Sequence, residues 1–332
     1  MDSLGKIGIL GGGTWGTAMA KIVLANQQNI NWYIRRDEQI EGFYKLGYNP
    51  HYLSNAKFNL SQIAFYSNIE KTIKDSDTII IAIPSPYVKQ TMKRVWSSSF
   101  KDKFVVSALK GIIPGDNAVM SEYLAYNFKI PIENLGVISG PCHAEEVALE
   151  RLSFLTVASK NVEKAHLLAE AVSSKILKAS VSNDVVGIEL AAVLKNIYAI
   201  AAGICQGLRY GDNFQAVLMS YCAKEMERFL EGVVPVQRNI CETHYLGDML
   251  VTGYSQFSRN RTFGAMLGKG YSVKSAQLEM EEMIAEGYYG SKCIYEMNQR
   301  FKIKIPIAET VYKILYEKVR PQTAIKKLIE GF

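Results

Sequence analysis

The sequence has little of what would mark a disulfide-bonded or zinc-binding protein. Its cysteines are few, odd in number and widely spaced, at positions 142, 205, 222, 241 and 293. No C-x-x-C pair occurs, so neither a metal site nor a redox pair is indicated. We expect reduced thiols in a cytoplasmic protein, and no bound metal.

Three further absences narrow the class of protein. No run approaches the roughly 18 apolar residues that a membrane span needs, and the first residues lack the apolar core of a leader. The formal net charge of +6 is modest, and the basic residues are scattered. We therefore expect no membrane span, no nucleic-acid partner and mild attraction for anionic small molecules.

What the sequence does have is a core-forming composition and a glycine motif near its start. With 332 residues, 48% of them hydrophobic, the chain suits about two domains. Gly11, Gly13 and Gly16 follow an apolar strand at 7–10 with the spacing G-x-G-x-x-G, and a helical pattern runs over 18–27. This order predicts a dinucleotide site, although glycine turns also close strand–helix units that bind nothing.

The choice of dinucleotide depends on the residues about 20 positions after the glycines. An acidic residue there would hold the ribose 2′-hydroxyl of NAD, but Arg35 and Arg36 occupy the place, with Asp37 and Glu38 behind them. Since arginine can pair with a 2′-phosphate, NADP is favoured or at least accepted. Two ordinary surface arginines are the other interpretation.

Apolar runs alternate with helical patterns through the first half of the chain. Strands are expected at 30–34, 63–66, 77–83, 103–109, 135–139, 154–158 and 176–180, with a loop and short helix at 42–60 and a helix at 162–174. This rhythm predicts an α/β fold, with a doubly wound Rossmann-type sheet over residues 1–184. Lys110 and Gly140 would then follow strand ends on one rim of the sheet, where open α/β sheets bind ligands.

After residue 184 the patterns become helical and predict an all-helical, substrate-binding domain over 185–332. The segment 185–207 is apolar on more than one face, as in a buried helix. Lys195 and Asn196 lie in its middle. Burial there would lower the pKa of Lys195 towards the range useful for proton transfer, unless the side chain reaches the surface. Other helices are expected at 214–230, 275–286, 290–301, 308–319 and after Pro321.

Two later segments carry polar groups that could contact a substrate. Asp248 stands between a glycine and an apolar stretch. Ser258, Arg259, Asn260 and Arg261 form a compact set of donors suited to a phosphate group, with an exposed polar turn as the other interpretation.

Taken in order, these segments resemble the bacterial NAD(P)-dependent glycerol-3-phosphate dehydrogenases over essentially the whole chain. The shared motifs are GGGTWGTA (11–18), LKG (109–111), ISGP (138–141), LKN (194–196), LGD (246–248), SRNR (258–261) and EGY (286–288). The resemblance implies interconversion of dihydroxyacetone phosphate and sn-glycerol 3-phosphate with NADP or NAD, as a step towards phospholipid.

The resemblance also implies roles for single residues. Lys195 would exchange a proton with the carbonyl oxygen, Asp248 would orient that lysine or a substrate hydroxyl, and Lys110 would stabilise the oxyanion or anchor the substrate. Further substrate contacts are implied at Gly140, Cys142, Asn196, Ser258, Arg259 and Asn260. Cofactor contacts are implied at Gly11, Gly13, Thr14, Trp15, Gly16, Arg35, Arg36, Lys110, Ala144, Arg259, Ile284 and Glu286.

The chain departs from the family pattern in three places. Cys142 replaces a hydroxyl with a weaker donor, and His143 stands where the family has an aromatic filler, which is the role we expect for it. Tyr245 replaces a common glycine ahead of Asp248. The alternatives are a hydroxy-acid dehydrogenase of similar two-domain layout, which would need a carboxylate clamp, and a non-catalytic NADP(H)-sensing module. A homodimer is the expected assembly.

Overall fold

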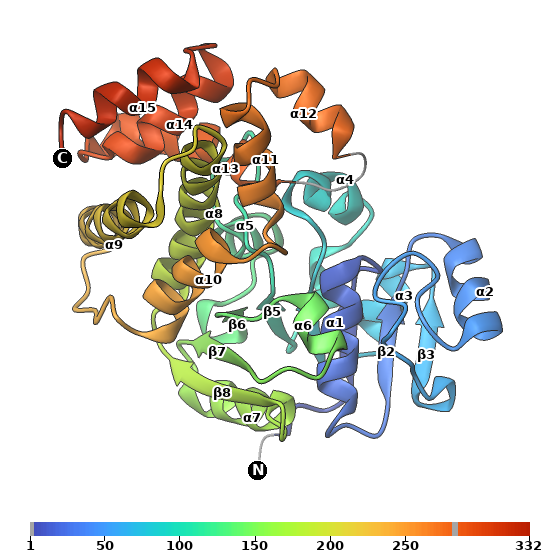
Figure 1. The fold of residues 1–332 in the computed structure, drawn as a ribbon. Coiled ribbons are helices and arrows are strands. Elements are labelled where there is room, and N and C mark those ends of the chain that lie inside the picture. The colour runs from blue at the N-terminus through green and yellow to red at the C-terminus, as the bar shows by residue number, and fades with distance from the viewer. Residues whose placement is uncertain (1–2, 281–284) are drawn as a thin grey trace. The chain divides into compact units, whose positions relative to one another are not determined.

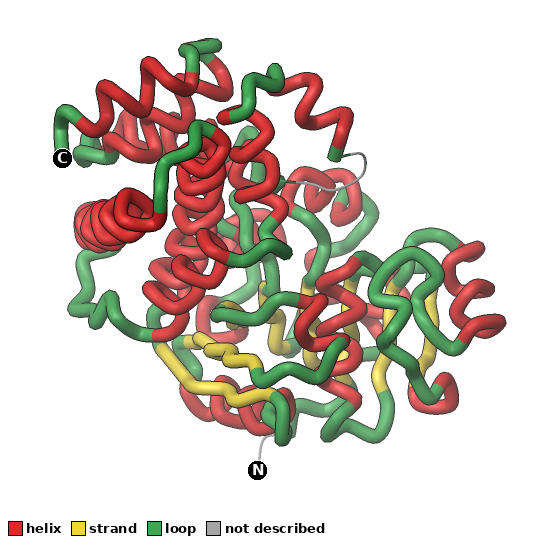
Figure 2. The backbone as a smooth tube through the Cα atoms, in the orientation of Figure 1, coloured by secondary structure: helices red, strands yellow, loops and turns green. Residues whose placement is uncertain are grey.

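The computed structural model describes residues 3–280 and 285–332 (Figure 1). Contacts divide the chain into two compact units. Unit 1 contains residues up to 109 together with 120–188, and unit 2 contains residues 110–119 together with those from 189 onward. The strands, drawn in yellow in Figure 2, all belong to unit 1. Unit 2 consists of helices and their connections in the described residues.

Unit 1 is built on one eight-stranded sheet with the order β3-β2-β1-β4-β5-β6-β7-β8. The strands are β1 (Ile7–Leu10), β2 (Ile30–Tyr33), β3 (Ile63–Tyr66), β4 (Thr78–Ile81), β5 (Phe104–Ser107), β6 (Leu135–Ser139), β7 (Ser153–Ser159) and β8 (Leu177–Ser182). Strands β1 to β6 run parallel, whereas β7 is antiparallel to β6 and parallel to β8. The strand order reverses beside β1, which confirms the predicted doubly wound sheet.

The central strands are buried along their whole length. Every residue of β1, β2, β4, β5 and β6 is buried. Their continuous apolar runs are therefore those of a parallel sheet enclosed on both faces. In the edge strand β8, by contrast, only Leu177 is buried, and the other residues are exposed or half-buried.

Seven helices of unit 1 are described: α1 (Thr14–Leu24), α2 (Asp37–Leu46), α3 (Ile69–Lys74), α4 (Val88–Met92), α5 (Met120–Phe128), α6 (Ala144–Ala148) and α7 (Val162–Val172). The first begins four residues before the expected start at 18, because Gly13 is its N-cap. The loop expected at 42–60 is partly wrong, because α2 begins earlier. Acidic residues in its first turn and a left-handed Gly47 (φ 74°) at its end set its limits.

The helices that follow are α8 (Val185–Gly207), α9 (Asp212–Val233), α10 (Asp248–Tyr254), α11 (Arg259–Gly268), α12 (Val273–Glu279), α13 (Glu286–Phe301), α14 (Pro306–Tyr316) and α15 (Pro321–Ile329). A π-helical turn at 243–247 leads into α10. Helix α11 was not among those expected. The Ser258 side chain accepts a hydrogen bond from the Arg261 N–H and so caps the N-terminus of α11. The polar segment 258–261 is therefore the start of a helix.

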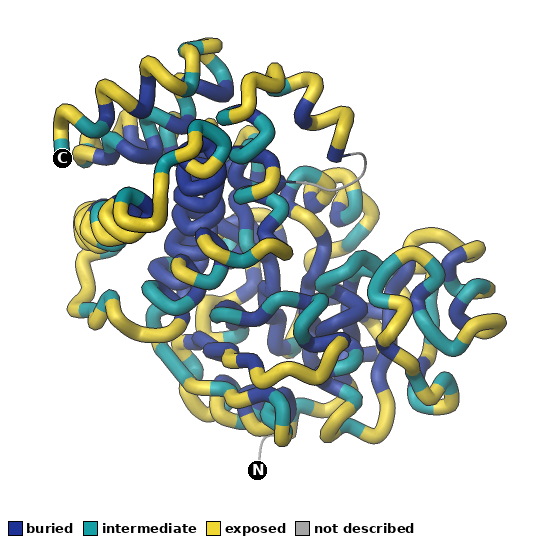
Figure 3. The backbone as a smooth tube through the Cα atoms, in the orientation of Figure 1, coloured by how far each residue is buried: buried dark blue, intermediate teal, exposed yellow. Residues whose placement is uncertain are grey.

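Helix α8 corrects one expectation drawn from the sequence. Its 23 residues are long and apolar enough to cross a membrane. The expectation that no segment of the chain has the length and apolar character of a membrane span was therefore wrong. Glu189 and Lys195 are its only charged residues. Within the protein, 94% of its most apolar 18-residue stretch is buried, and Figure 3 shows α8 in the dark blue of buried residues. It is therefore a core helix.

Glycines let α11 and α13 approach the backbone of α8 directly. A Cβ atom on Gly264 would lie 2.1 Å from the Ile200 carbonyl oxygen, and one on Gly203 would lie 2.0 Å from the Arg261 carbonyl oxygen. On α13, a Cβ atom on Gly287 would lie 2.5 Å from the carbonyl oxygen of Asn196. No other residue type fits these positions without separating the helices.

We predict that Gly264→Ala lowers the free energy of unfolding by about 3 kcal/mol, because the methyl group would overlap the α8 backbone. Urea denaturation followed by circular dichroism measures the change. Gly211→Ala is the matched control, since a Cβ atom there meets nothing within 4 Å. Equal effects of the two substitutions would contradict the close packing of α8 and α11.

Candidate functional site

The glycine turn between β1 and α1 has a shape that only glycine permits. Gly11 has a φ of +130°, and a Cβ atom there would lie 2.7 Å from the Ala82 carbonyl oxygen. A Cβ atom on Gly16 would lie 2.1 Å from the Gly11 carbonyl oxygen, so the turn folds back closely on itself. Beside Gly13 there is open space, because a Cβ atom would meet nothing within 4 Å.

This space lies at the N-terminus of α1, whose N-cap residue, Gly13, has no side chain to fill it. A helix N-terminus with room beside it suits the pyrophosphate of a dinucleotide. The turn therefore fits the group that the sequence motif predicts.

Two buried side chains that the sequence analysis missed hold the turn in place. The Gln39 Nε2 donates to the Gly12 carbonyl oxygen at 2.7 Å, and the Asn49 Nδ2 donates to the same oxygen at 3.1 Å. The Asn49 amide also donates to the Thr17 hydroxyl at 2.7 Å. The sequence offers a signal for Gln39 only. It lies one helical turn before the buried Phe43 on α2, so both side chains fall on the buried face of that helix.

Other predicted cofactor residues of unit 1 lie around this turn or on its rim. Thr14 is the first residue of α1, and the Trp15 Nε1 donates to the Ala108 carbonyl oxygen at 2.8 Å, which ties α1 to the end of β5. Arg35 and Arg36 are exposed and follow β2 after one buried residue, Ile34. Because β1 and β2 are parallel, both arginines lie at the same sheet edge as the glycine turn.

The segment after β6 holds the remaining predicted residues of unit 1. Gly140 has a φ of +128°, and a Cβ atom there would lie 2.9 Å from the Phe154 carbonyl oxygen. Cys142 and Ala144 are buried, and His143 is the N-cap residue of α6. Burial leaves the Cys142 thiol little surface for a ligand contact.

The predicted catalytic residues of unit 2 form one cluster. The Lys195 ammonium group pairs with the Asp248 Oδ1, and the Lys110 Nζ lies 3.6 Å from the Asp248 Oδ2. Lys195 is 3% exposed and Asp248 1%, whereas the Lys110 side chain is 19% exposed. One buried carboxylate thus lies between two amines, one enclosed and one half-buried.

Burial decides the charge state of Lys195. It lowers the pKa of Lys195 from 10.5 to about 7. The carboxylate of Asp248 opposes this by favouring the ammonium form, and the nearby Lys110 lowers the pKa further. Both forms of Lys195 are therefore populated near neutral pH, as a group that donates and accepts a proton requires.

The local fold positions the carboxylate. Asp248 opens α10 after the π-helical turn, and the Thr252 hydroxyl donates to its carbonyl oxygen at 2.6 Å. Tyr245, which replaces the usual glycine, is buried and packs on His244 with ring centroids 4.2 Å apart. The replacement is accommodated by this turn and leaves Asp248 in the cluster.

A chain of hydrogen bonds connects the cluster to α11 and α13. The Asn196 Nδ2 donates to the Lys110 carbonyl oxygen at 2.6 Å, and the Asn260 Nδ2 donates to the Asn196 Oδ1 at 2.9 Å. The Asn260 Oδ1 accepts the Gly287 N–H at 2.9 Å. Both asparagines are buried. Their amides therefore hold the backbone at Lys110, a role the sequence did not reveal.

The other predicted residues of unit 2 lie at helix starts. Ser258 is buried as the N-cap of α11, and the half-buried Arg259 is the first residue of that helix. Glu286 is the half-buried first residue of α13. Ile284, predicted to contact the cofactor, lies outside the described residues.

Comparisons with known proteins show the family of this chain. Models for the N-terminus and C-terminus of NAD-dependent glycerol-3-phosphate dehydrogenase match residues 6–165 and 184–326. The glycerol-3-phosphate dehydrogenase (NAD(P)+) of Clostridium botulinum is 33% identical over 98% of this chain and 97% of its own. That of Bacillus velezensis is 31% identical over 98% and 94%.

A solved structure agrees as well. The glycerol-3-phosphate dehydrogenase of Coxiella burnetii superposes with a TM-score of 0.90 at 29% identity and covers 98% of this chain and 99% of its own. The family match supports the dehydrogenase interpretation and neither of its alternatives. The chain belongs to the NAD(P)-dependent glycerol-3-phosphate dehydrogenase family.

Proposed function

We propose that this protein reduces dihydroxyacetone phosphate to sn-glycerol 3-phosphate, and catalyses the reverse reaction, in the supply of phospholipid precursor. The observation that carries the proposal is the buried Lys195–Asp248 pair with Lys110 beside it. A carbonyl reduction needs a proton donor whose pKa lies near the working pH, and Lys195 meets that requirement.

The dinucleotide is held by unit 1 in this proposal. Gly11, Gly13 and Gly16 shape the turn, the start of α1 attracts the pyrophosphate, and the Trp15 indole ties the helix to Ala108 after β5. When bound, the reduced nicotinamide supplies a hydride to the carbonyl carbon of the substrate.

Proton transfer belongs to unit 2. The Lys195 ammonium gives a proton from Nζ to the carbonyl oxygen as the alcohol forms, and the neutral amine takes the proton back in the oxidation. Asp248 keeps the Lys195 amine oriented and raises its pKa, which increases the fraction of Lys195 that is protonated. Lys110, fixed through its backbone by Asn196, offers a second positive charge to the developing oxyanion.

Phosphate binding is proposed for the start of α11. Arg259 supplies a guanidinium group, and the helix N-terminus adds a favourable dipole. We assign a secondary part in contacting the substrate to Ser258, the N-cap of α11, and to Asn260, which donates to Asn196.

The first prediction concerns the proton donor. Purified protein should oxidise NADPH or NADH when dihydroxyacetone phosphate is added, with absorbance at 340 nm as the readout, and Lys195→Met should lower kcat by about a thousandfold. The exposed Lys269→Met is the matched control and should leave kcat unchanged. Absence of turnover by the native protein with either dinucleotide would overturn the proposed function.

The second prediction concerns pH. Reduction requires the ammonium form of Lys195, so its kcat/KM should fall as the pH rises through about 7, and that of oxidation should fall as the pH drops through about 7. In Asp248→Asn the ammonium loses its carboxylate partner, so the inflection should move to lower pH. Asp212→Asn, an exposed carboxylate at the start of α9, is the control. An inflection that stays in place in Asp248→Asn would remove Asp248 from this role.

The third prediction concerns cofactor choice. If Arg35 and Arg36 pair with the 2′-phosphate, replacing both by alanine should raise the KM for NADPH by about tenfold or more and change the KM for NADH little. Lys45→Ala on α2 tests whether any loss of positive charge nearby has the same effect. Parallel changes for both dinucleotides would show that the arginines do not select NADP.

Two expectations about assembly and location accompany the proposal. We infer a homodimer that works in the cytoplasm, and the exposed Leu250, Tyr254 and Phe257, on and after α10, support an apolar interface. Light scattering after gel filtration should give twice the chain mass of 37.1 kDa. A mass of one chain across micromolar concentrations would contradict the dimer.

A further inference from the structure

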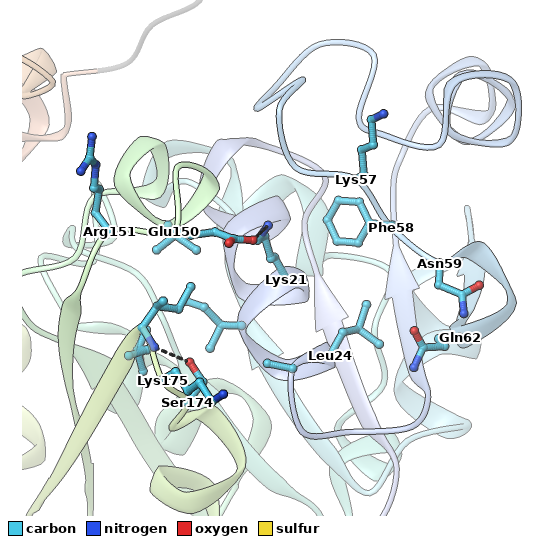
Figure 4. Close-up of a pocket in the computed structure, with 15 residues that line it drawn as sticks. Lys21, Leu24, Lys57, Phe58, Asn59, Gln62, Glu150, Arg151, Ser174 and Lys175 are labelled. Atoms are coloured by element: carbon cyan, nitrogen blue, oxygen red, sulfur yellow. Dashed lines mark hydrogen bonds and ion pairs between the residues drawn. The ribbon is translucent and has the colours of Figure 1, made fainter.

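Unit 1 contains a groove that the dehydrogenase chemistry does not use (Figure 4). Four separate segments form it: the last turn of α1, residues 57–62 ahead of β3, residues 147–151 at the end of α6, and residues 174–177 between α7 and β8. Its volume is about 480 Å³, which is in the range of small-molecule sites.

The floor of the groove is apolar and belongs to the core of unit 1. Ile22, Val147 and Leu177 line it while being only 5%, 2% and 2% exposed. Leu24 and Phe58 complete the surface as partly buried side chains packed on the same core. An apolar ligand here would extend the hydrophobic core and lose its own contact with water.

The rim of the groove carries four cations and one carboxylate. Glu150 pairs with Lys21 at 3.1 Å, so its charge is already balanced. Lys57, Arg151 and Lys175 are exposed around the opening, and no carboxylate of the described residues pairs with their side chains. In Figure 4, Arg151 and Lys57 lie towards opposite ends of the apolar surface. The rim therefore has three positive charges in excess (four cations less one anion).

We propose that this groove binds an amphiphile that has a single alkyl chain and a phosphate head. The apolar floor selects the chain, and the cationic rim selects the doubly charged head. A neutral lipid would leave the rim without a partner. A nucleotide is disfavoured because Phe58 is the one aromatic residue in the lining.

The groove and the dinucleotide turn use opposite ends of α1. The turn precedes Thr14, whereas the groove is lined from Lys21 onward. Seven residues at about 1.5 Å each place these points about 10 Å apart along the helix. The amphiphile should therefore bind without displacing the dinucleotide.

Calorimetric titration of the full-length protein with dodecyl phosphate, below the concentration at which it forms micelles, tests the proposal. We expect saturable binding at one site per chain. Octyl phosphate should bind more weakly, by about fourfold for each methylene no longer buried. Dodecyl maltoside and inorganic phosphate supply the chain and the head separately, and neither should bind comparably.

Two variants place the binding in the groove. Lys175→Glu should weaken dodecyl phosphate binding by about tenfold, whereas Lys178→Glu, exposed three residues further on and outside the lining, should not. Ala25→Trp should block the groove from an exposed position, and an unchanged melting temperature would show that it folds.

Three results of these titrations would contradict binding in the groove. Failure of dodecyl phosphate to bind, equal binding by Lys175→Glu and native protein, or binding of inorganic phosphate alone would overturn the proposal. The titration involves no substrate and no turnover, so it succeeds or fails independently of the proposed dehydrogenase activity.

Discussion

The contact between Lys195 and Asp248 is the constraint on which the rest of unit 2 depends. Taking an ammonium and a carboxylate out of water costs several kcal/mol each, and their attraction offsets this only while the geometry is held. Lys195 lies in the middle of α8 and Asp248 at the start of α10, and both side chains are buried. Any movement of either helix that separated the two groups would leave a charge buried without its partner. The surrounding packing must therefore be rigid, and the pKa of Lys195 near 7 is the direct result of that enclosure.

Two features supply this rigidity. Glycines on α8, α11 and α13 bring the three backbones into contact, so that Asn260 and Gly287 reach Asn196. The asparagine amides then carry hydrogen bonds through to the backbone at Lys110. Buried amides of this kind are costly when unpaired, and each of these has a partner. Lys110 is thus fixed by its main chain, while its side chain stays half-buried.

Much of the fold and part of the site followed from sequence patterns, for identifiable reasons. The strands β3 and β6 and the helix α8 have the predicted limits, because apolar runs bounded by polar residues depend on local sequence. Gln39 and Asn49 escaped prediction because they support Gly12 from positions far along the chain. Helix α11 was missed because its polar first turn resembles an exposed loop until its burial against α8 is known.

The sequence alone determined the limits of several strands and of α8, the change from strands to helices after residue 184, the glycine turn and the family, since these rest on residue type and spacing. The tertiary structure decided which groups meet. It showed that Lys195 is enclosed instead of reaching the surface, that Asp248 lies between two amines, and that Asn196 holds the Lys110 backbone. The physical reason is that desolvation and ion pairing depend on distances between segments up to about 140 positions apart along the chain, and no local pattern encodes those distances.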